Sequence, residues 1–239
     1  MREKQIKTVL NSKLPRRGLK DNFNAFMVEN SKYEGKDDIP ICPSTMMRFP
    51  TKIITFEEAR KEIKKDNPDF NATVCFSKDD YKFDSKNSGI WVRPYEWLKF
   101  LTPFEAVVQP DFSTNSDFPK VLAKYNTYRM RTLGCFLANN GIPVINNYRS
   151  NGVSSFDYCT DGIPENSLVF ISTHGCIRDI CNRERLKQGL NYLIMKKNPS
   201  AIVIYGRVPK EVSNILKLKK IPFKSYKTDL DRRLEDFHE

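Results

Sequence analysis

The amino-acid sequence predicts an α/β protein with a parallel sheet of βα units, and three observations support this fold class. Seven short apolar or β-branched runs recur along the chain, and most are followed by a segment with helical spacing of apolar residues. The runs themselves are continuously apolar, which is typical of strands buried on both faces. Because alternating strands and helices form right-handed parallel crossovers, we expect a barrel-like, TIM-type sheet, with an open doubly wound sheet as the alternative.

The strands and helices can be assigned from these runs and the segments between them. The expected strands are 52–55, 73–76, 106–109, 142–146, 168–172, 201–205 and 222–226. The expected helices are 56–65, 92–101, 119–140, 183–198 and 210–220, with a weaker candidate at 154–159. The helix at 183–198 has the strongest pattern, an apolar stripe that ends before Pro199, and the helix at 119–140 has a proline at its start and Gly141 after its end.

The domain organisation follows from where this rhythm begins. Residues 1–50 lack it and contain four prolines, so we expect a basic N-terminal arm and an irregular lead-in. Residues 51–239 are expected to form a single α/β domain, because 39% apolar residues in a chain of 239 can build one substantial core. The sequence leaves the oligomeric state open.

The cellular setting is predicted from segments that the chain lacks. No apolar run approaches the roughly 20 residues that cross a bilayer, and the first residues have no apolar core of a secretory signal. We therefore expect a cytoplasmic protein without membrane contact. In a reducing cytoplasm its six cysteines are expected to be buried or partly buried thiols.

The positive charge of the chain lies at its two ends. The net charge is +11, of which residues 1–65 carry +6, residues 66–182 carry −2 and residues 183–239 carry +7. Clustered cations suit the phosphate backbone of DNA or RNA, although a solvated lysine-rich surface explains the same composition. The candidate nucleic-acid contacts are Lys13, Arg16, Arg17, Lys219, Lys220, Lys224 and Lys227, the last group interleaved with Phe223 and Tyr226 as rings that could stack on bases.

Polar side chains follow four of the expected strands, where functional groups of parallel α/β proteins gather. The catalytic candidates are Asp111, as general base or orienting group, and Asn146, His174 and Tyr205. The candidate contacts to an anionic substrate are Ser113, Arg129, Arg149, Ser172 and Gly206. Helix-capping turns also favour such residue types, so a purely structural role stays open for them.

His174 is the one histidine away from the C-terminus and hence the sole candidate imidazole acid or base. Its spacing to Cys176 and Cys181 lacks the second ligand pair of a zinc site, and a Cys176–His174 dyad would need an extended strand where a turn is expected. We expect no metal and no cofactor. The chain also lacks the glycine-rich, zincin and hydrolase motifs that would name a reaction.

Two arginines of the 119–140 segment receive different predictions. Helical spacing puts Arg129 on the apolar stripe that faces the sheet, with Asp111 or Asp161 as its partner. That pair would be either structural or part of an anion-binding site. Arg131, turned roughly 200° away by two residues of helix, is expected to face solvent.

Several blocks of the chain together resemble a domain-of-unknown-function family, number 4417, found in phages, plasmids and other mobile elements of Gram-positive bacteria. The blocks are residues 76–83, Trp91 with Pro94 and Trp97, and residues 107–113, 128–134, 141–145, 156–164, 171–175 and 203–206. They occur in order over about residues 73–210. The resemblance implies a mobile-element context and a bacterial host cell, but it supplies no activity.

Three functions therefore stay open. The first is a nucleic-acid-associated protein that binds DNA or RNA through its basic ends. The second is an enzyme that acts on a small anionic ligand or nucleotide in the pocket at the strand ends. The third is an interaction protein that binds a host factor through an aromatic surface formed by Tyr81, Phe83, Trp91 and Trp97.

Overall fold

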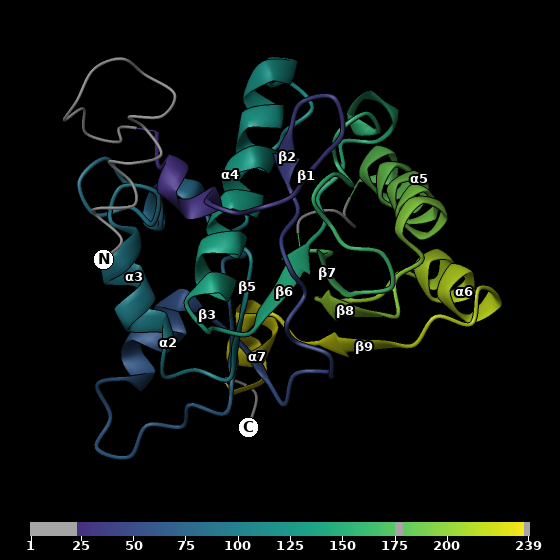
Figure 1. The fold of residues 1–239 in the computed structure, drawn as a ribbon. Coiled ribbons are helices and arrows are strands. Elements are labelled where there is room, and N and C mark those ends of the chain that lie inside the picture. The colour runs from purple at the N-terminus through teal and green to yellow at the C-terminus, as the bar shows by residue number, and fades with distance from the viewer. Residues whose placement is uncertain (1–22, 175–178, 237–239) are drawn as a thin grey trace, which may run out of the picture.

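A seven-stranded parallel sheet dominates the structure, a computed structural model that describes residues 23–174 and 179–236. Its strands stand in chain order, and each is parallel to the next. They are β3 (Ile53–Thr55), β4 (Thr73–Cys75), β5 (Ala106–Val108), β6 (Val144–Asn147), β7 (Leu168–Ser172), β8 (Ala201–Tyr205) and β9 (Phe223–Tyr226). The sheet curls into a nearly closed barrel flanked by helices (Figure 1), which confirms the predicted fold class.

The helices cover the outside of this sheet. They are α2 (Phe56–Glu62), α3 (Pro94–Leu101), α4 (Lys120–Asn139), α5 (Ile180–Lys197), α6 (Lys210–Leu218) and α7 (Asp229–Asp236). All five firmly expected helices and all seven strands are present, with shifted ends, whereas the charged helix α7 was not expected. The candidate at 154–159 is only a short 3-10 turn, η3 (Val153–Ser155).

Local side-chain chemistry sets two of these helix ends. Thr55 caps α2, accepting from the Glu58 backbone N–H while Glu58 accepts from the Thr55 backbone N–H. Asp179 caps α5 by accepting from the Asn182 backbone N–H. The cap starts α5 at Ile180, three residues before the expected start.

The barrel interior is filled by alternate side chains of the strands. One buried cluster contains members from all seven strands: Ile53, Cys75, Ala106, Val108, Ile145, Leu168, Phe170, Val203, Tyr205 and Tyr226. Met46, from the segment that precedes β3, belongs to the same cluster. The backbone N–H groups of Thr45 and Met46 donate to the Val144 carbonyl at the start of β6. The lead-in segment thus closes the N-terminal end of the barrel.

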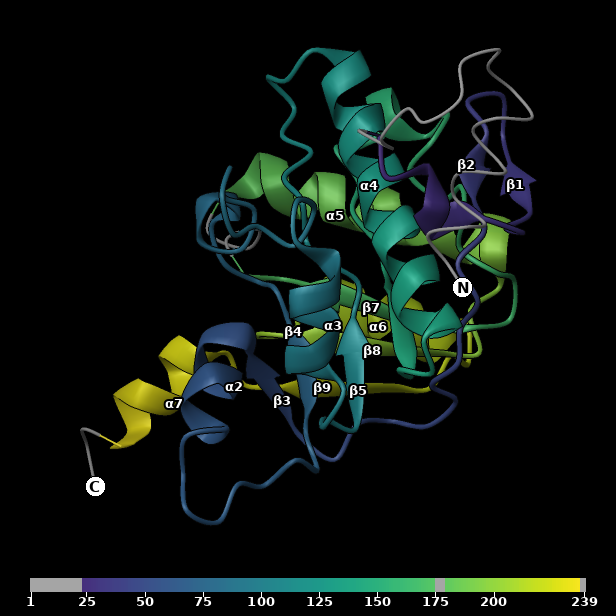
Figure 2. The same ribbon diagram turned by 60° about the vertical axis from the view of Figure 1, so that its left-hand side comes forward.

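Side chains of β9 and α7 reach the segments that flank β3. The Tyr226 hydroxyl of β9 donates to the carbonyl of Pro50, which precedes β3, at 2.6 Å. Arg232 of α7 donates to Glu58 of α2 at 2.8 Å, and these two helices lie next to each other in Figure 2. Among the described residues no backbone ladder pairs β9 with β3. This junction, the seam, is the one place where the strand-to-strand hydrogen bonding of the described barrel is interrupted.

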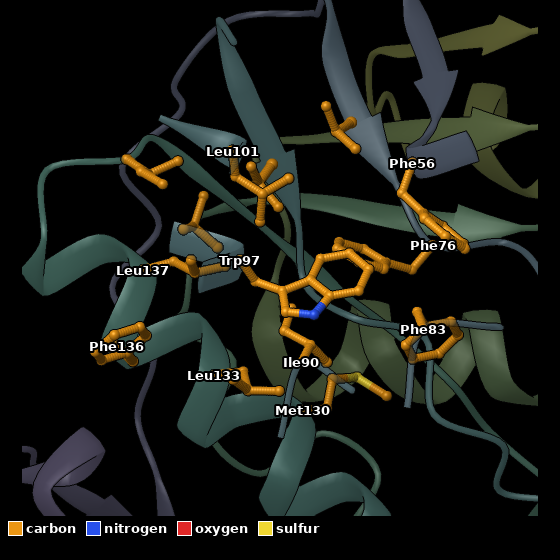
Figure 3. Close-up of a cluster of buried hydrophobic side chains, with 14 of the residues drawn as sticks. Phe56, Phe76, Phe83, Ile90, Trp97, Leu101, Met130, Leu133, Phe136 and Leu137 are labelled. Carbon is orange, nitrogen blue, oxygen red and sulfur yellow. The ribbon is translucent and has the colours of Figure 1, made fainter. Parts of the chain in front are cut away.

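An aromatic core packs between α2, α3, α4 and the outer face of β4 and β5 (Figure 3). Phe56, Phe76, Phe83 and Trp97 lie ring against ring there, with centroids 5.4 to 6.0 Å apart. Phe83 and Trp97 are therefore core residues. The aromatic surface proposed for a host factor does not exist as predicted, although Tyr81 is exposed.

The two arginines of α4 lie differently from their predictions. Arg131 is buried, and donates to the carbonyls of Asp161, Asn147 and Cys159 and to Gln109 Oε1. Burial lowers the pKa of Arg131 to about 10, which still leaves it charged at neutral pH. Arg129 is partly buried, but its ion-pair partner is Asp84 at 2.5 Å, neither Asp111 nor Asp161.

Arg131 is buried because its side chain points toward the ends of β5 and β6. Its guanidinium donates to Gln109, directly after β5, and to the Asn147 carbonyl of β6, while the carbonyls of Cys159 and Asp161 accept from it on the loop side. The turn η1 (Ala25–Val28) and the strand β2 (Ile39–Pro40), which pairs with β1 (Tyr33–Glu34), also contact α4. The spacing of apolar residues along α4 alone could not reveal these polar partners.

Four cysteines, Cys42, Cys75, Cys135 and Cys159, are buried thiols as expected, whereas Cys181 on α5 is exposed, contrary to the expectation for all six. Cys176 lies outside the described residues. None of the helices that the structure describes has the length and apolar composition needed to cross a membrane.

Candidate functional site

The carboxyl ends of β4 to β7 form a polar layer above the apolar barrel interior. Along β4, β6 and β7 the inward positions continue from Cys75, Ile145 and Phe170 to the polar residues Ser77, Asn147 and Ser172. All three are buried. Ser77 Oγ and Asn147 Oδ1 are buried without a hydrogen-bond partner among the described residues. Such orphaned atoms are typical of a site that a ligand or water completes.

Asp111, three residues after β5, lies at the centre of this layer. Its Oδ1 accepts from Asn147 Nδ2 at 2.9 Å and lies 3.2 Å from Arg149 Nε. The side chain is only 9% exposed. Burial raises the pKa of Asp111 above its ordinary value, and the charge of Arg149 and the Asn147 hydrogen bond oppose this only in part.

Asp111 borders a cleft of about 310 Å³, here called the mouth cleft. Its lining residues are Ser77, Lys78, Asp79, Lys82, Asp111, Ser113, Arg149, Ser172 and His174. A buried carboxylate that is held by one hydrogen bond and lines a cleft is suited to exchange a proton with a ligand there.

Three cations border the mouth cleft. Lys78 lies 3.4 Å from Glu57 and 2.5 Å from Asp229, and Lys82 lies 3.2 Å from Glu57. Burial alone would raise the pKa of Glu57, but Lys82 and Lys78 lower it overall, which keeps this carboxylate charged. The third cation is Arg149, which lies beside Asp111. The carboxylates Asp79 and Asp111 line the same cleft, so its lining combines three cations with two carboxylates.

A larger cleft of about 660 Å³, here called the side cleft, adjoins the first and shares Arg149, Ser172 and His174 with it. It runs between the ends of β6 and β7, the loop after β5 and the first turns of α5. Its other lining residues are Asn115, Ser116, Asp117, Tyr148, Ser150, Asn151, Ile171, Asp179, Asn182, Arg185, Leu186 and Gly189. Because the two clefts share residues, one ligand could occupy both.

The structure brings five of the nine predicted site residues together. Asp111, Ser113, Arg149, Ser172 and His174 all line the mouth cleft. Ser113 is held there by Asp80, which accepts from its backbone N–H at 3.0 Å and its hydroxyl at 2.9 Å.

The other four lie elsewhere. Asn146 is buried and donates to the Cys42 carbonyl, because one residue of strand turns a side chain to the opposite face. The Tyr205 ring lies inside the barrel, its hydroxyl accepting from the Asp229 backbone N–H at 2.9 Å. Arg129, on α4, lies over the ring of Phe112. Gly206 packs against Thr173.

Sequence reasoning missed Asn147, Ser77, Lys78 and Lys82. The expected strand 142–146 stopped one residue short of Asn147, although the inward alternation set by Ile145 selects Asn147 rather than Asn146. The same alternation selects Ser77 two residues after Cys75. The signal was therefore present, but it required knowing which face of each strand points into the barrel.

The remaining predicted contacts give a mixed result. Lys13, Arg16 and Arg17 lie outside the described residues. Lys219 and Lys220 are exposed after the end of α6, whereas Lys227 pairs with Glu235 at 2.7 Å. Lys224 lies over the Tyr226 ring, and that ring is buried in the barrel, so it cannot stack on bases as predicted.

No group of three or more His, Cys, Asp or Glu side chains suited to a metal ion occurs in the described part of the chain. Of the three residues considered for a zinc site, His174, Cys176 and Cys181, Cys176 lies outside the described residues.

Comparisons with known proteins find a matching family and similar proteins from phages. The profile of the family described as "Domain of unknown function (DUF4417)" matches residues 31–227. The "Gene 1 protein" of Mycobacterium phage D29 is 32% identical over 158 residues, which are 66% of this chain and 56% of that protein. The "Gene 1 protein" of Mycobacterium phage L5 is 33% identical over 133 residues, 56% of each protein. The chain thus spans about half the length of these relatives, and no solved structure matches it.

Proposed function

The chain belongs to the DUF4417 family of domains of unknown function, and from the geometry of its mouth cleft we propose that it is an enzyme that binds a small anionic ligand there. The observation that carries this proposal is a buried Asp111 that lines the same cleft as the cations Lys78, Lys82 and Arg149. In the proposed mechanism Arg149, Lys78 and Lys82 hold an oxyanion such as phosphate or carboxylate. Asp111 accepts a proton from the bound ligand and returns it.

Asp111 fits this role because burial raises its pKa above the ordinary value of an aspartate and its anchored oxygen fixes its direction. A general base works best when its pKa lies near the working pH. His174, exposed where the two clefts join, is the second group able to exchange a proton there. The exposed position gives it access to the larger part of a ligand.

Binding of inorganic pyrophosphate, followed by titration calorimetry, tests the proposal. We expect Arg149→Met to weaken binding at least tenfold, because it removes a cation from the centre of the rim. Arg48→Met is the matched control, since Arg48 is exposed and pairs with Glu105, away from the cleft residues. Equal binding by wild type and Arg149→Met, or no binding to either, would contradict the proposal.

A second measurement isolates Asp111. An ionised carboxylate repels a neighbouring anion, so Asp111→Asn should bind pyrophosphate more tightly than wild type near pH 7. Turnover of a true substrate should instead fall by about 10²–10⁴ in this variant, the usual contribution of a general base. A purely structural Asp111 would show neither effect.

Nucleic-acid association is a second candidate function, favoured by the exposed Lys217, Lys219 and Lys220 at the end of α6. These lysines form no ion pair with other described residues. Binding to DNA or RNA oligonucleotides should fall steeply with salt. Replacing the three lysines by glutamine should make the logarithmic salt dependence on duplex DNA shallower, by about 0.9 for each phosphate that the variant no longer neutralises. Salt-independent binding, or none, would rule this function out.

The proposal also covers the genetic elements that encode such proteins and the cell in which they act. The relatives are phage proteins, and we expect family members also on plasmids and other mobile elements of Gram-positive bacteria, acting in the cytoplasm of the host cell. A host-factor role would need a different surface from the predicted aromatic one, because two of its four rings are buried.

A further inference from the structure

The mouth cleft and the side cleft differ in chemistry. The mouth cleft is small and carries the cations Lys78, Lys82 and Arg149. The side cleft has about twice the volume and is lined mainly by uncharged groups. Arg149 borders both clefts, so a ligand that fills them places its charged group on the Asp111 side of Arg149 and a larger neutral part on the other side.

The side cleft has an apolar floor. Ile171 at the end of β7 and Tyr148 after β6 are nearly buried, and Leu186 of α5 is partly buried against the same core. The Tyr148 hydroxyl donates to the Gly189 carbonyl at 2.9 Å, which ties this floor to α5. A floor built from aliphatic and aromatic side chains suits the face of a flat ring.

The rim of the side cleft carries three side-chain amides. Asn115 and Asn151 have amide groups that form no hydrogen bond with other described residues, and the Asn182 amide only accepts one from Arg185 at 3.2 Å. An amide presents a donor and an acceptor side by side. This pattern matches the polar edge of a nucleobase, which likewise places donors beside acceptors.

From this division we infer that the ligand of the joined clefts is a nucleoside phosphate, with its base in the side cleft and its phosphate in the mouth cleft beside Arg149 and Asp111. The inference rests on the proposed function, because it names the class of anion that the mouth cleft holds. The clefts of about 310 and 660 Å³ lie within the range of roughly 300–1,000 Å³ that small-molecule sites occupy.

One buried atom of the mouth cleft gives a second, independent observation. Ser77 Oγ, in a side chain only 8% exposed, lines this cleft without a hydrogen-bond partner in the described residues. A phosphate oxygen accepts a hydrogen bond from a hydroxyl, so Ser77 adds a neutral donor to the three cations. Arg149 remains the shared residue that couples both parts of the ligand.

Calorimetric titration of the full chain with four probes tests the inference: inorganic pyrophosphate, ribose 5-phosphate, each nucleoside 5′-monophosphate, and the matching nucleoside. We expect at least one nucleoside monophosphate to bind at least tenfold more tightly than ribose 5-phosphate. Asn182→Ala and Asn115→Ala should each remove part of this gain and leave pyrophosphate binding unchanged. Asn191→Ala is the matched control, because Asn191 is an exposed asparagine of α5 outside both clefts.

Each outcome has a distinct meaning. Pyrophosphate binding without any gain from the base overturns the inference and leaves the proposed function standing. Absence of binding by every probe overturns both. A gain that survives Asn182→Ala and Asn115→Ala also overturns the inference, since the base then lies elsewhere. A 5′-phosphorylated tetranucleotide that competes with the nucleoside monophosphate would show that the ligand is the 5′ end of a nucleic-acid strand rather than a free nucleotide.

Discussion

Arg131 and Gln109 meet beneath the mouth cleft, where Gln109 Oε1 accepts hydrogen bonds from both the Arg131 guanidinium and the Asn147 backbone N–H. Arg131 also donates to the Asn147 carbonyl at 2.8 Å. Asn147 in turn donates to Asp111. A buried guanidinium of α4 therefore fixes the end of β6, and through it the orientation of the proposed general base.

Arg131→Met should destabilise the protein by about 3–5 kcal/mol, because it leaves several buried acceptors without a donor. Urea unfolding measures this loss. Arg93→Met, at an exposed arginine, should change the free energy of unfolding by less than about 0.5 kcal/mol. An Arg131→Met protein as stable as the Arg93 variant would show that the buried network contributes nothing.

Asp111→Asn should leave the melting temperature at pH 7 equal to or above that of wild type. The pKa of Asp111 is higher in the folded than in the unfolded chain, where it is near 3.8. Its contribution to stability is therefore complete below that value and is lost as pH rises through the folded pKa. A neutral asparagine avoids this cost. Thermal unfolding between pH 4 and 8 should show the difference shrinking toward low pH, and a lower melting temperature at pH 7 would refute the argument.

Asp229 should show the opposite pH dependence. Burial alone would raise the pKa of Asp229, but hydrogen bonds and charge from Lys78 and Arg233 lower it overall. Its stabilising contribution is therefore present above about pH 3.8 and is lost as pH falls through the lower folded value. Asp229→Asn should lose stability at neutral pH and flatten the acid limb of an unfolding curve. Asp66→Asn, on an exposed loop, is the control and should leave that limb unchanged.

Gly162 and Gly141 provide a matched pair, since both have positive φ angles, 75° and 85°. A Cβ on Gly162 would lie 2.4 Å from the Pro40 carbonyl oxygen and 2.9 Å from Arg131 Cγ, whereas one on Gly141 meets no atom within 4 Å. Gly141→Ala should cost about 1 kcal/mol from backbone strain alone. Gly162→Ala should cost at least about 2 kcal/mol more, measured by urea unfolding, because it also separates the lead-in from Arg131. Equal losses would contradict the tight packing of the lead-in there.

The sequence predicted the strands well because their apolar runs are short, continuous and separated by clear helical stretches. Helix α7 was missed because its residues are mostly charged, and it is held by ion pairs such as Arg232 with Glu58 rather than by an apolar stripe. Arg131 is buried by polar groups at the ends of β5 and β6 and by two loop carbonyls, and the local pattern of α4 could not reveal these partners.

The candidate site was predicted in part. The expected strand ends bring Asp111, Arg149 and Ser172 to one cleft, because the loops after parallel strands converge at one edge of the sheet. Asn146 was predicted as a site residue, but Asn147 is the residue that contacts Asp111. Adjacent residues of a strand face opposite sides, so a shift of one residue decides which of the two points into the barrel. The lysines of the mouth cleft follow β4, where the sequence offered charged residues too common on surfaces to stand out.

The seam between β9 and β3 gives the barrel one side that can open without breaking a β ladder. Lys78 and Asp229 sit on opposite sides of this seam, and Lys78 also lines the mouth cleft. An anion that draws Lys78 away from Asp229 would loosen the closure, and a loosened closure would in turn widen the mouth. Amide hydrogen exchange along β9 should therefore be faster than in β7. It should become faster still when an anion occupies the mouth cleft, so that exchange at the seam reports ligand binding.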